Sequence, residues 1–260
     1  MIRINRQPPA NTQMLADLTK WRKKAKRVTQ QLCACAPAKR AALIDYKADV
    51  YRHKAFKAYL IWLTHEKCAY CEATVRHVDH GEVEHYRPKK SVQGEIHPGY
   101  YWLAFDEKNM LFSCSQCNQR EKMTRFPIRG KRVVAPGNLK QELPDLINPY
   151  EDDPELELEF VVDSTEKDFA WVRGRTYRGE ISKTIYSLNR DRLQRDRDIF
   201  LRQFLSHWNA LYTDKRRRNE LLDLARKIQN GEYEYAAFCR AAIQQFFKDE
   251  QRKLQELAAL

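Results

Sequence analysis

Two Cys-x2-Cys pairs constrain the fold of this chain more than any other feature. Cys68 and Cys71 form the first pair, Cys114 and Cys117 form the second, and 42 residues separate them. A Cys-x2-Cys turn directs two thiolates at one ion, and two such turns complete a four-cysteine zinc site with Zn–S bonds of ~2.3 Å. Because all four positions would be filled by the protein, we predict a structural Zn²⁺ that joins distant segments. The alternative is four unrelated buried thiols.

The remaining cysteines, Cys33, Cys35 and Cys239, lack this spacing, and we expect them to be packing residues. In a reducing compartment, Cys-x2-Cys spacing favours metal over disulfide. The first residues have no apolar segment of the kind found in secretory signals, and no apolar run approaches the ~20 residues of a membrane span. We therefore expect a cytoplasmic protein.

Positive charge is concentrated in the first quarter of the chain. The formal net charge is +12, and residues 1–67 hold 15 Lys and Arg against 4 Asp and Glu. This asymmetry favours a polyanionic partner near that end, with nucleic acid as the leading interpretation. A solvated basic face with no such partner is an equally simple interpretation.

The N-terminal region is expected to be helical. Apolar residues recur at helical spacing over 14–32, and a second helical stretch is expected from about 38 to 65. The expected core positions of these helices are Trp21, Ala25, Val28, Leu32, Leu43, Tyr46, Val50, Tyr59, Leu60 and Leu63.

The segment between the cysteine pairs is expected to hold short strands. We predict strands at 74–78 and 82–86 around a turn at His80-Gly81. Residues 110–113 form a short apolar run, and a helix is expected to begin near Ser115 and end before Phe126.

The rest of the chain adds a hairpin and helices. Residues 156–162 alternate as in a strand, 169–177 are the expected partner strand, and helices are expected over 179–228 and 233–258. The predicted fold class is α+β, mostly α. Its three parts would be a basic helical region (1–67), a zinc-stabilised core (68–128) and a β-hairpin with a helical region (129–260).

Two acid–histidine pairs lie between the cysteine pairs: Asp79-His80 and Glu84-His85. Hydrolysis of a phosphodiester with one metal ion needs a carboxylate and a second ligand for that ion. It also needs a histidine that takes a proton from the attacking water, and a group that fixes the orientation of this histidine. The two pairs are therefore candidates for the chemical centre of the protein.

The surrounding residues distinguish the two pairs. Residues 84–88 (EHYRP), followed by 109–118 (NMLFSCSQCN), resemble the pattern of HNH, or ββα-metal, nucleases. In that family an acid precedes the histidine, a proline follows it by three residues, and an asparagine precedes a short apolar run. A final His or Asn follows the second cysteine turn. His85 matches this pattern, whereas His80 does not and is interpreted as part of the turn.

Longer stretches resemble one HNH subfamily, the PtuB-like nucleases of Septu-type and retron-associated bacterial antiviral defence systems. These stretches are CAYCE, VEHYRPK, YYWLAFDEKN, CSQCNQREKMTRFPI, INPYEDDP and LNRDRL, and they lie between residues 66 and 195. The resemblance implies a zinc-stapled ββα-metal core and a nucleic-acid substrate, DNA before RNA. It also implies a PtuA-like ATPase partner and, in some systems, a retron reverse transcriptase with its DNA.

The resemblance also implies roles for individual residues. His85 would be the general base, Glu84 and Asn118 would bind the catalytic ion, and Asn109 would hold the loop that orients His85. Many HNH nucleases have Asp where this chain has Glu84. Oxygen ligands at both metal positions favour Mg²⁺ or Mn²⁺ over zinc.

Basic residues near these positions are candidates for contact with phosphate. Lys122 follows Asn118 by four residues, and we expect it either to stabilise phosphate charge in the transition state or to lie on a solvated face. Arg87 and Arg120 are candidate nucleic-acid contacts. Tyr100, Tyr101 and Trp102 are expected in the core rather than in a base-stacking surface.

The sequence therefore predicts a metal-dependent HNH endonuclease that hydrolyses phosphodiester bonds and leaves 5′-phosphate and 3′-hydroxyl ends. We expect it to be the nuclease of an antiphage defence system that works with an ATPase. Two other hypotheses remain open. One is a non-catalytic, zinc-containing module that binds nucleic acid or serves as an adaptor. The other is a restriction-type HNH endonuclease.

Overall fold

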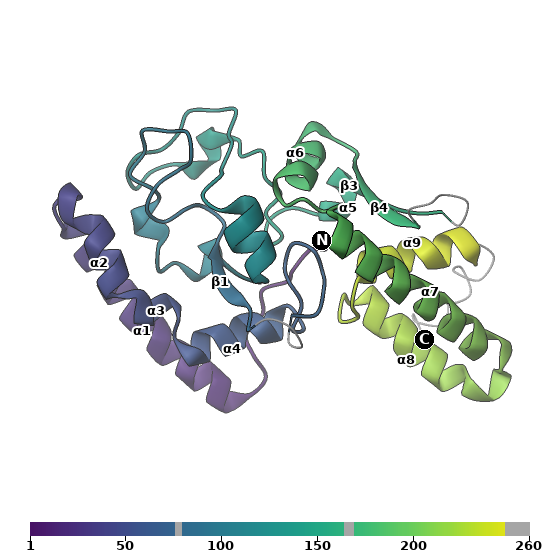
Figure 1. Ribbon diagram of the computed structural model, residues 1–260. Coiled ribbons are helices and arrows are strands. Elements are labelled where there is room, and N and C mark those ends of the chain that lie inside the picture. The colour runs from purple at the N-terminus through teal and green to yellow at the C-terminus, as the bar shows by residue number, and fades with distance from the viewer. Residues whose placement is uncertain (76–79, 164–168, 248–260) are drawn as a thin grey trace. The chain divides into compact units, whose positions relative to one another are not determined.

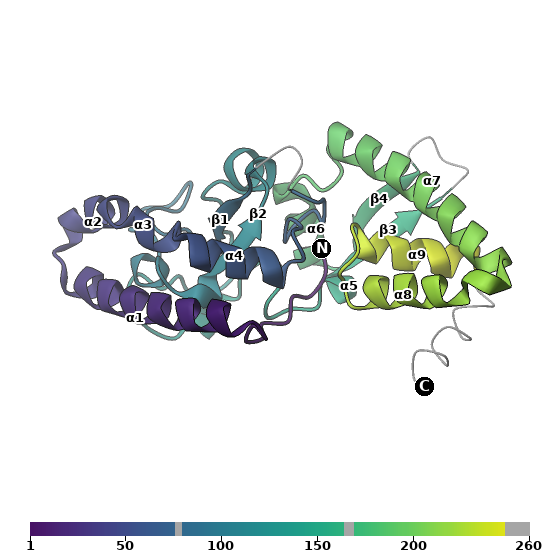
Figure 2. The ribbon, with the colours of Figure 1, turned by 90° about the horizontal axis from the view of Figure 1, so that it is seen from below.

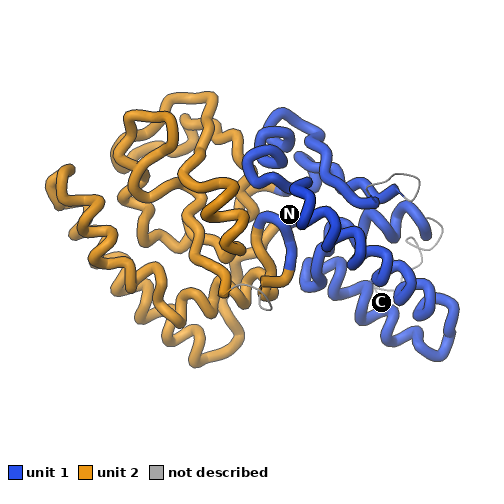
Figure 3. Tube along the Cα trace, viewed as in Figure 1, with its two compact units in different colours: residues 1–2, 70–73, 153–260 blue, residues 3–69, 74–152 orange. Residues whose placement is uncertain are grey.

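The computed structural model describes residues 1–75, 80–163 and 169–247. The chain forms two compact units (Figure 3). Unit 1 comprises residues 1–2, 70–73 and 153–260, and unit 2 comprises residues 3–69 and 74–152. Within the described residues, no helix has both the length and the apolar character needed to cross a membrane.

Unit 2 begins with helices (Figure 1). The predicted helix over 14–32 is confirmed as α1 (Thr12–Ala34), which is capped by the side chain of Asn11. The single helix predicted over 38–65 is wrong: the chain forms α2 (Arg40–Tyr46), α3 (Ala48–Tyr51) and α4 (Lys54–Leu63). At His53 the backbone is extended, with ψ at 131°, so α3 cannot continue into α4.

Helices α1 and α4 lie side by side (Figure 2), and aromatic packing joins them. Trp21 stacks on Phe56 with ring centroids 3.8 Å apart, and the Trp21 indole N–H donates to the carbonyl of Val50 at 2.7 Å. The core positions predicted on α1 are all buried. On α2, Tyr46 was predicted to lie in the core but is 77% exposed, and Ile44 is buried instead.

A two-stranded antiparallel sheet follows these helices. Strand β1 (Glu82–His85) pairs with β2 (Met110–Ser113), with Glu82 opposite Ser113 and His85 opposite Met110. The strand predicted at 74–78 lies mostly outside the described residues, so its pairing with β1 remains a prediction. The partner that the structure shows, β2, was not predicted as a strand pair, and its apolar residues are all buried and provide a core-facing strand. Residues 76–79, including Asp79, lie outside the described residues.

The helix predicted to begin near Ser115 is η4 (Gln116–Lys122), a π-type helix. Its wider turn is closed by the N–H of Met123, which donates to the carbonyl of Asn118 at 2.8 Å. π-type turns are rare and are often found at functional sites. In chain order, the site region thus consists of β1, a long connection, β2 and η4.

Unit 1 contains a second antiparallel pair, β3 (Leu158–Val162) with β4 (Ala170–Gly174), as the sequence predicted. Its helices are α5 (Pro154–Glu157), α6 (Tyr177–Ile185), α7 (Asp191–Thr213), α8 (Arg218–Gln229) and α9 (Ala236–Phe246). Phe204 and Trp208 of α7 are buried, as are Leu224 and Ile228 of α8.

Two small sheets among many helices agree with the predicted mostly helical α+β class. The division into domains at residues 67 and 128 remains a prediction. Residues 3–69 and 74–152 form one compact unit, so the basic helices and most of the segment between the cysteines share a core.

Candidate functional site

The four paired cysteines come together as a candidate metal centre. The Sγ atoms of Cys68, Cys71, Cys114 and Cys117 all lie within 4.8 Å of one another. Four thiolates bonded to one Zn²⁺ at ~2.3 Å in a tetrahedron would have their sulfur atoms ~3.8 Å apart. Only a small contraction of the cluster separates these two arrangements, so the residues fit a zinc ion.

The backbone prepares both cysteine turns. The N–H of Cys117 points at the Sγ of Cys114 at 3.4 Å, a contact that stabilises a thiolate. The N–H of Ala69 donates to the carbonyl of Phe112 at 2.9 Å, which ties the first turn to β2. Of the other cysteines, Cys239 is buried as expected, but Cys33 is exposed and is not a packing residue.

His85 lies at the end of β1 with only 4% of its surface exposed. Its Nε2 is 2.9 Å from the carbonyl oxygen of Ala104, and its Nδ1 is 3.4 Å from the Nζ of Lys89. A carbonyl can only accept, so Nε2 carries the proton and Nδ1 keeps the lone pair. Burial, followed by the charge of Lys89, lowers the pKa of His85 well below its ordinary value. The ring is therefore a neutral imidazole with Nδ1 as its acceptor.

Asn109 fixes the backbone directly after His85. Its side-chain oxygen accepts the N–H of Arg87 at 2.8 Å, and its Nδ2 donates to the carbonyl of Arg87 at 2.9 Å. The same Nδ2 reaches the carbonyl of Leu103 at 3.3 Å, one residue before the Ala104 that binds His85. A single buried amide thus connects the end of β1 to the loop that holds the imidazole.

Glu84 is paired with Lys122. A carboxylate oxygen of Glu84 lies 2.7 Å from the Nζ of Lys122, and both side chains are buried. The ammonium also donates to the backbone carbonyl of His85 at 2.9 Å. Lys122 therefore does not lie on a solvated face: its charge is compensated inside the protein.

Asn118 contacts a different carboxylate, that of Glu82. The Nδ2 of Asn118 donates to Glu82 Oε2 at 2.7 Å, and the Gln119 amide donates to the other oxygen of the same carboxylate. Glu82 and Glu84 are two residues apart on β1, so their side chains project from the same face of the strand. Among the described residues, no Lys or Arg forms an ion pair with Glu82.

The remaining predicted positions differ in exposure. Arg87 is buried: its Nε donates to Glu142 at 3.0 Å and its guanidinium lies over the ring of Phe126. Contact between Arg87 and a phosphate would require this ion pair to open. Arg120 and His80 are exposed. Tyr100, Tyr101 and Trp102 are buried, as predicted.

Two residues of the site, Glu82 and Glu142, were not identified from the sequence. Lys89 was considered together with Arg87 as a phosphate contact, but its contact with His85 was not predicted. Glu82 could have been found from strand periodicity, because it shares a face with Glu84. Lys89 follows the EHYRP stretch directly, but its approach to His85 depends on how the loop folds. Glu142 is fully buried and also accepts from Tyr100 and from the N–H of Val133, contacts that no local pattern indicates.

Comparison with known proteins gives one strong similarity. The chain is 37% identical to "Septu protein PtuB" of Bacillus mycoides (strain KBAB4) over 158 residues, which cover 57% of this chain and 52% of the relative. No family model matches the chain, and no solved structure matches it. The chain thus spans about half the length of the curated relative to which it is similar.

Proposed function

We propose that this protein is a metal-dependent HNH-type endonuclease and the nuclease of a Septu-type antiphage defence system. The similarity to Septu protein PtuB supports the system, and the residue pattern around His85 supports the chemistry. The observation that carries the proposal is the state of His85: a neutral imidazole, bound through Nε2 to a carbonyl, with an unprotonated Nδ1 that faces Lys89.

In the proposed reaction, Nδ1 of His85 accepts a proton from the water that attacks phosphorus. The bond to Ala104 and the amide of Asn109 keep the ring in one orientation during this transfer. Lys89 brings positive charge to the same side of the ring, next to Nδ1, where the phosphate would lie. Cleavage would leave a 5′-phosphate and a 3′-hydroxyl.

Mg²⁺ or Mn²⁺ would be held by Asn118 together with the carboxylates of β1. When bound, such an ion neutralises a phosphate oxygen and the leaving oxygen. The carboxylate of Glu82 fits a cation better than that of Glu84, because Glu82 has neutral amide partners and Glu84 already has the ammonium of Lys122. We therefore add Glu82 to the ligands Glu84 and Asn118 expected from the sequence.

Septu systems pair PtuB with PtuA, which is an ATPase, and we propose a PtuA-like ATPase as the partner of this chain. The substrate in this proposal is DNA before RNA. Association with a retron reverse transcriptase and its DNA is a more specific form of the same proposal.

The buried Glu84–Lys122 pair favours a second candidate, a zinc-containing module that binds nucleic acid or a protein without catalysis. A carboxylate held by an ammonium inside the protein is not free for a metal ion. This candidate keeps the zinc site and the basic N-terminal helices but needs no reaction at His85.

Purification with the products of neighbouring genes, followed by cleavage assays on panels of DNA and RNA, tests the proposal. We expect an ATPase to copurify and cleavage to depend on a divalent ion and on His85. His80→Ala is the matched control, because His80 is exposed and should leave activity unchanged. Binding of nucleic acid without cleavage under every divalent ion and partner would favour the non-catalytic module.

A further inference from the structure

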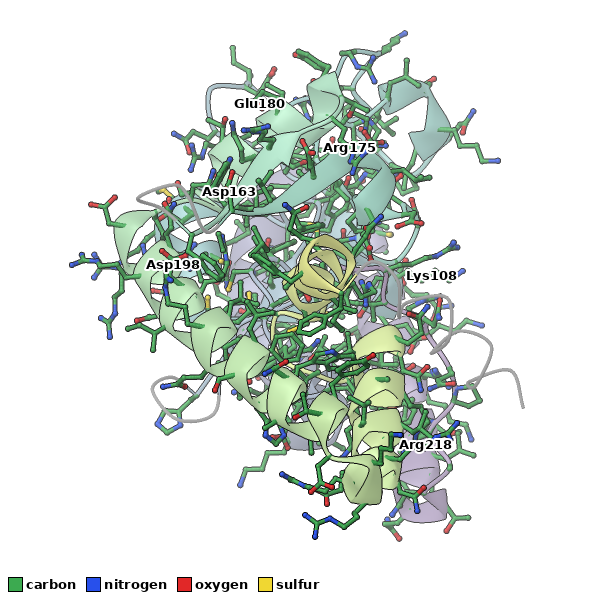
Figure 4. The ribbon with its side chains drawn as sticks, turned by 90° about the vertical axis from the view of Figure 1, so that its right-hand side faces the viewer. Lys108, Asp163, Arg175, Glu180, Asp198 and Arg218 are labelled. Carbon is green, nitrogen blue, oxygen red and sulfur yellow. The ribbon has the colours of Figure 1, made fainter. Side chains whose placement is uncertain are left out.

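The small sheet of unit 1 has two edges of different character. Along β4, three outward N–H groups and the carbonyl of Val172 are bonded to side chains. Two of these side chains, Glu180 and Asp198, are labelled in Figure 4. The Asn189 amide makes both bonds to Val172, accepting its N–H and donating to its carbonyl, each at 2.8 Å. The other two outward N–H groups donate to carboxylates, Ala170 to Asp198 at 2.9 Å and Gly174 to Glu180 at 3.3 Å.

In the part of the chain that the structure describes, strand β3 has no comparable cover. The backbone N–H of Arg175 donates to the carbonyl of Glu157, and the N–H of Asp163 donates to that of Phe169. With the strand register, these bonds show that the backbone N–H and C=O groups of odd-numbered residues of β3 point toward β4. The N–H and C=O of Phe160 and Val162 therefore point away from β4. Within the described residues, none of these four groups has a hydrogen-bond partner, whereas the outward groups of Leu158 are bonded to Pro154 and Arg175.

A groove of about 470 Å³ runs along this edge. Every residue from 158 to 163 lines it, whereas a pocket over one face of the strand would be lined by alternate residues only. Its other wall is α9, which contributes the small residues Ala237 and Ala241, one helical turn apart, with Arg240, Gln244 and Gln245. The unpaired backbone of β3 thus faces an open groove rather than packed side chains.

We propose that the β3 edge binds an extended segment of a partner protein, which adds to the sheet as a third strand. The N–H and C=O groups of Phe160 and Val162 are spaced two residues apart, as in a strand that is ready to pair. They can form hydrogen bonds with another extended backbone but not with a compact ligand. An exposed edge strand can pair with another chain and cause aggregation, so proteins usually cover it. In this protein Asn189, Asp198 and Glu180 cover the edge of β4 in this way. The open groove at β3 is the arrangement expected where pairing is used.

The side chains around the groove define the chemistry of the segment. Phe160 packs against Phe238 of α9, so one face of an added strand would lie over α9 and meet Ala237 and Ala241. The opposite face would lie beside Glu159, which is partly exposed and has no ion-pair partner within the described part of the chain. Arg240 is already paired with Glu155. The segment should therefore alternate apolar and basic residues.

The test uses the full ¹⁵N-labelled chain and an acetylated eight-residue peptide of alternating valine and lysine. We expect the amide signals of Phe160 and Val162 to shift on addition of the peptide and to become protected from hydrogen exchange. A peptide of the same sequence, N-methylated at alternate backbone nitrogens so that it cannot pair with a strand, should cause neither change. Protection of both amides before any peptide is added would overturn the proposal, because the edge would already be covered.

Two variants separate strand pairing from nonspecific binding. Val162→Pro removes one outward N–H and leaves the β3–β4 bonds intact, so peptide affinity should fall about tenfold through the loss of one hydrogen bond and its flanking interactions. Glu159→Lys should reverse the charge preference of the groove, so that a valine–glutamate peptide binds better than the valine–lysine peptide. This result does not depend on whether Val162→Pro folds. Glu232→Lys, in the same unit but outside the groove, is the matched control. Equal binding by the N-methylated peptide, or unchanged affinity in both groove variants, contradicts strand addition.

Discussion

Glu84 and Lys122 form the most buried ion pair of the candidate site, and their energetics can be measured. Lys122→Met would leave the Glu84 carboxylate charged and without its cation, at a cost of about 3–5 kcal/mol in the free energy of unfolding. Replacing both residues, as Glu84→Gln with Lys122→Met, should recover part of this loss. Urea unfolding of the two variants gives the comparison.

Arg120→Met is the matched control for this pair, because Arg120 lies on the same helix η4 but is exposed. Its unfolding free energy should stay within about 0.5 kcal/mol of the parent value. A Lys122→Met variant as stable as the Arg120→Met variant would mean that the buried pair does not form.

Glu82 is the residue-scale addition to the metal site. We expect Glu82→Gln and Asn118→Ala each to weaken Mn²⁺ binding at least about tenfold, the loss seen even for groups that only support a metal ligand. Electron paramagnetic resonance of free Mn²⁺ measures this affinity. Glu121→Gln, a neighbouring carboxylate bound to Gln116, should leave it unchanged. If Glu82→Gln binds Mn²⁺ normally and Glu84→Gln does not, Glu84 is the carboxylate ligand on β1 and Glu82 is not.

The sequence identified residues best where they stand in a motif that resembles a known family, even when they are far apart along the chain. His85 and Asn109 stand in a recognisable pattern, and the structure connects them through the backbone of residues 87 and 103. The contact of Glu82 with Asn118 was missed because 36 residues separate the two and no motif relates them. The partners of Lys122 were also missed, since its side chain reaches β1 only from the π-type turn of η4.

At the scale of elements, periodicity predicted helical segments but not where they break. The single helix expected over 179–228 is wrong, because the chain leaves the helical conformation between α6 and α7 and again between α7 and α8. α1 has a regular apolar stripe over 23 residues, so its burial pattern follows from sequence alone. Residues 40–63 form three shorter helices, because the backbone leaves the helical conformation at Lys47, where ψ is 17°, and is extended at His53, where ψ is 131°. The pairing of β1 with β2 could not be predicted from local pattern, since 24 residues separate the two strands and a nearer candidate existed.

The zinc site makes a prediction at the element scale, because it joins the turn after α4 to the turn after β2. The purified chain should carry one zinc ion, and Cys117→Ser should lose it together with several kcal/mol of stability. Elemental analysis and thermal unfolding measure both quantities. Cys239→Ser should keep the metal, because Cys239 is buried but lies outside the cluster. Full zinc content in Cys117→Ser would contradict a four-cysteine site.

At the scale of the whole molecule, the structure shows which positive charges remain available. On α1, Arg22 is paired with Glu107, Lys24 with Asp49, and Lys20 with Asp17. Lys23, Lys26 and Arg27 are exposed and have no ion-pair partner in the described part of the chain. These three residues are therefore the charges of α1 that can neutralise phosphates.

We predict that replacing Lys23, Lys26 and Arg27 by glutamine lowers the slope of log affinity against log salt by up to ~2.7 for duplex DNA, about 0.9 for each phosphate that is no longer neutralised. Fluorescence anisotropy across a salt series measures the slope. The matched control replaces Arg216, Arg217 and Arg226, which are all ion-paired. Equal slopes for the two triple variants would indicate that α1 binds a protein instead.

Single-turnover nicking of supercoiled plasmid by the full chain, with its copurifying ATPase and Mn²⁺, tests the central claim most directly. If His85 is the general base, His85→Ala should lower the rate constant by ~10²–10⁴. Zinc content and unfolding should be unchanged in that variant, and the exposed His80→Ala should cut at the parent rate. Nicking by His85→Ala at the parent rate would contradict the assignment of His85 as the base.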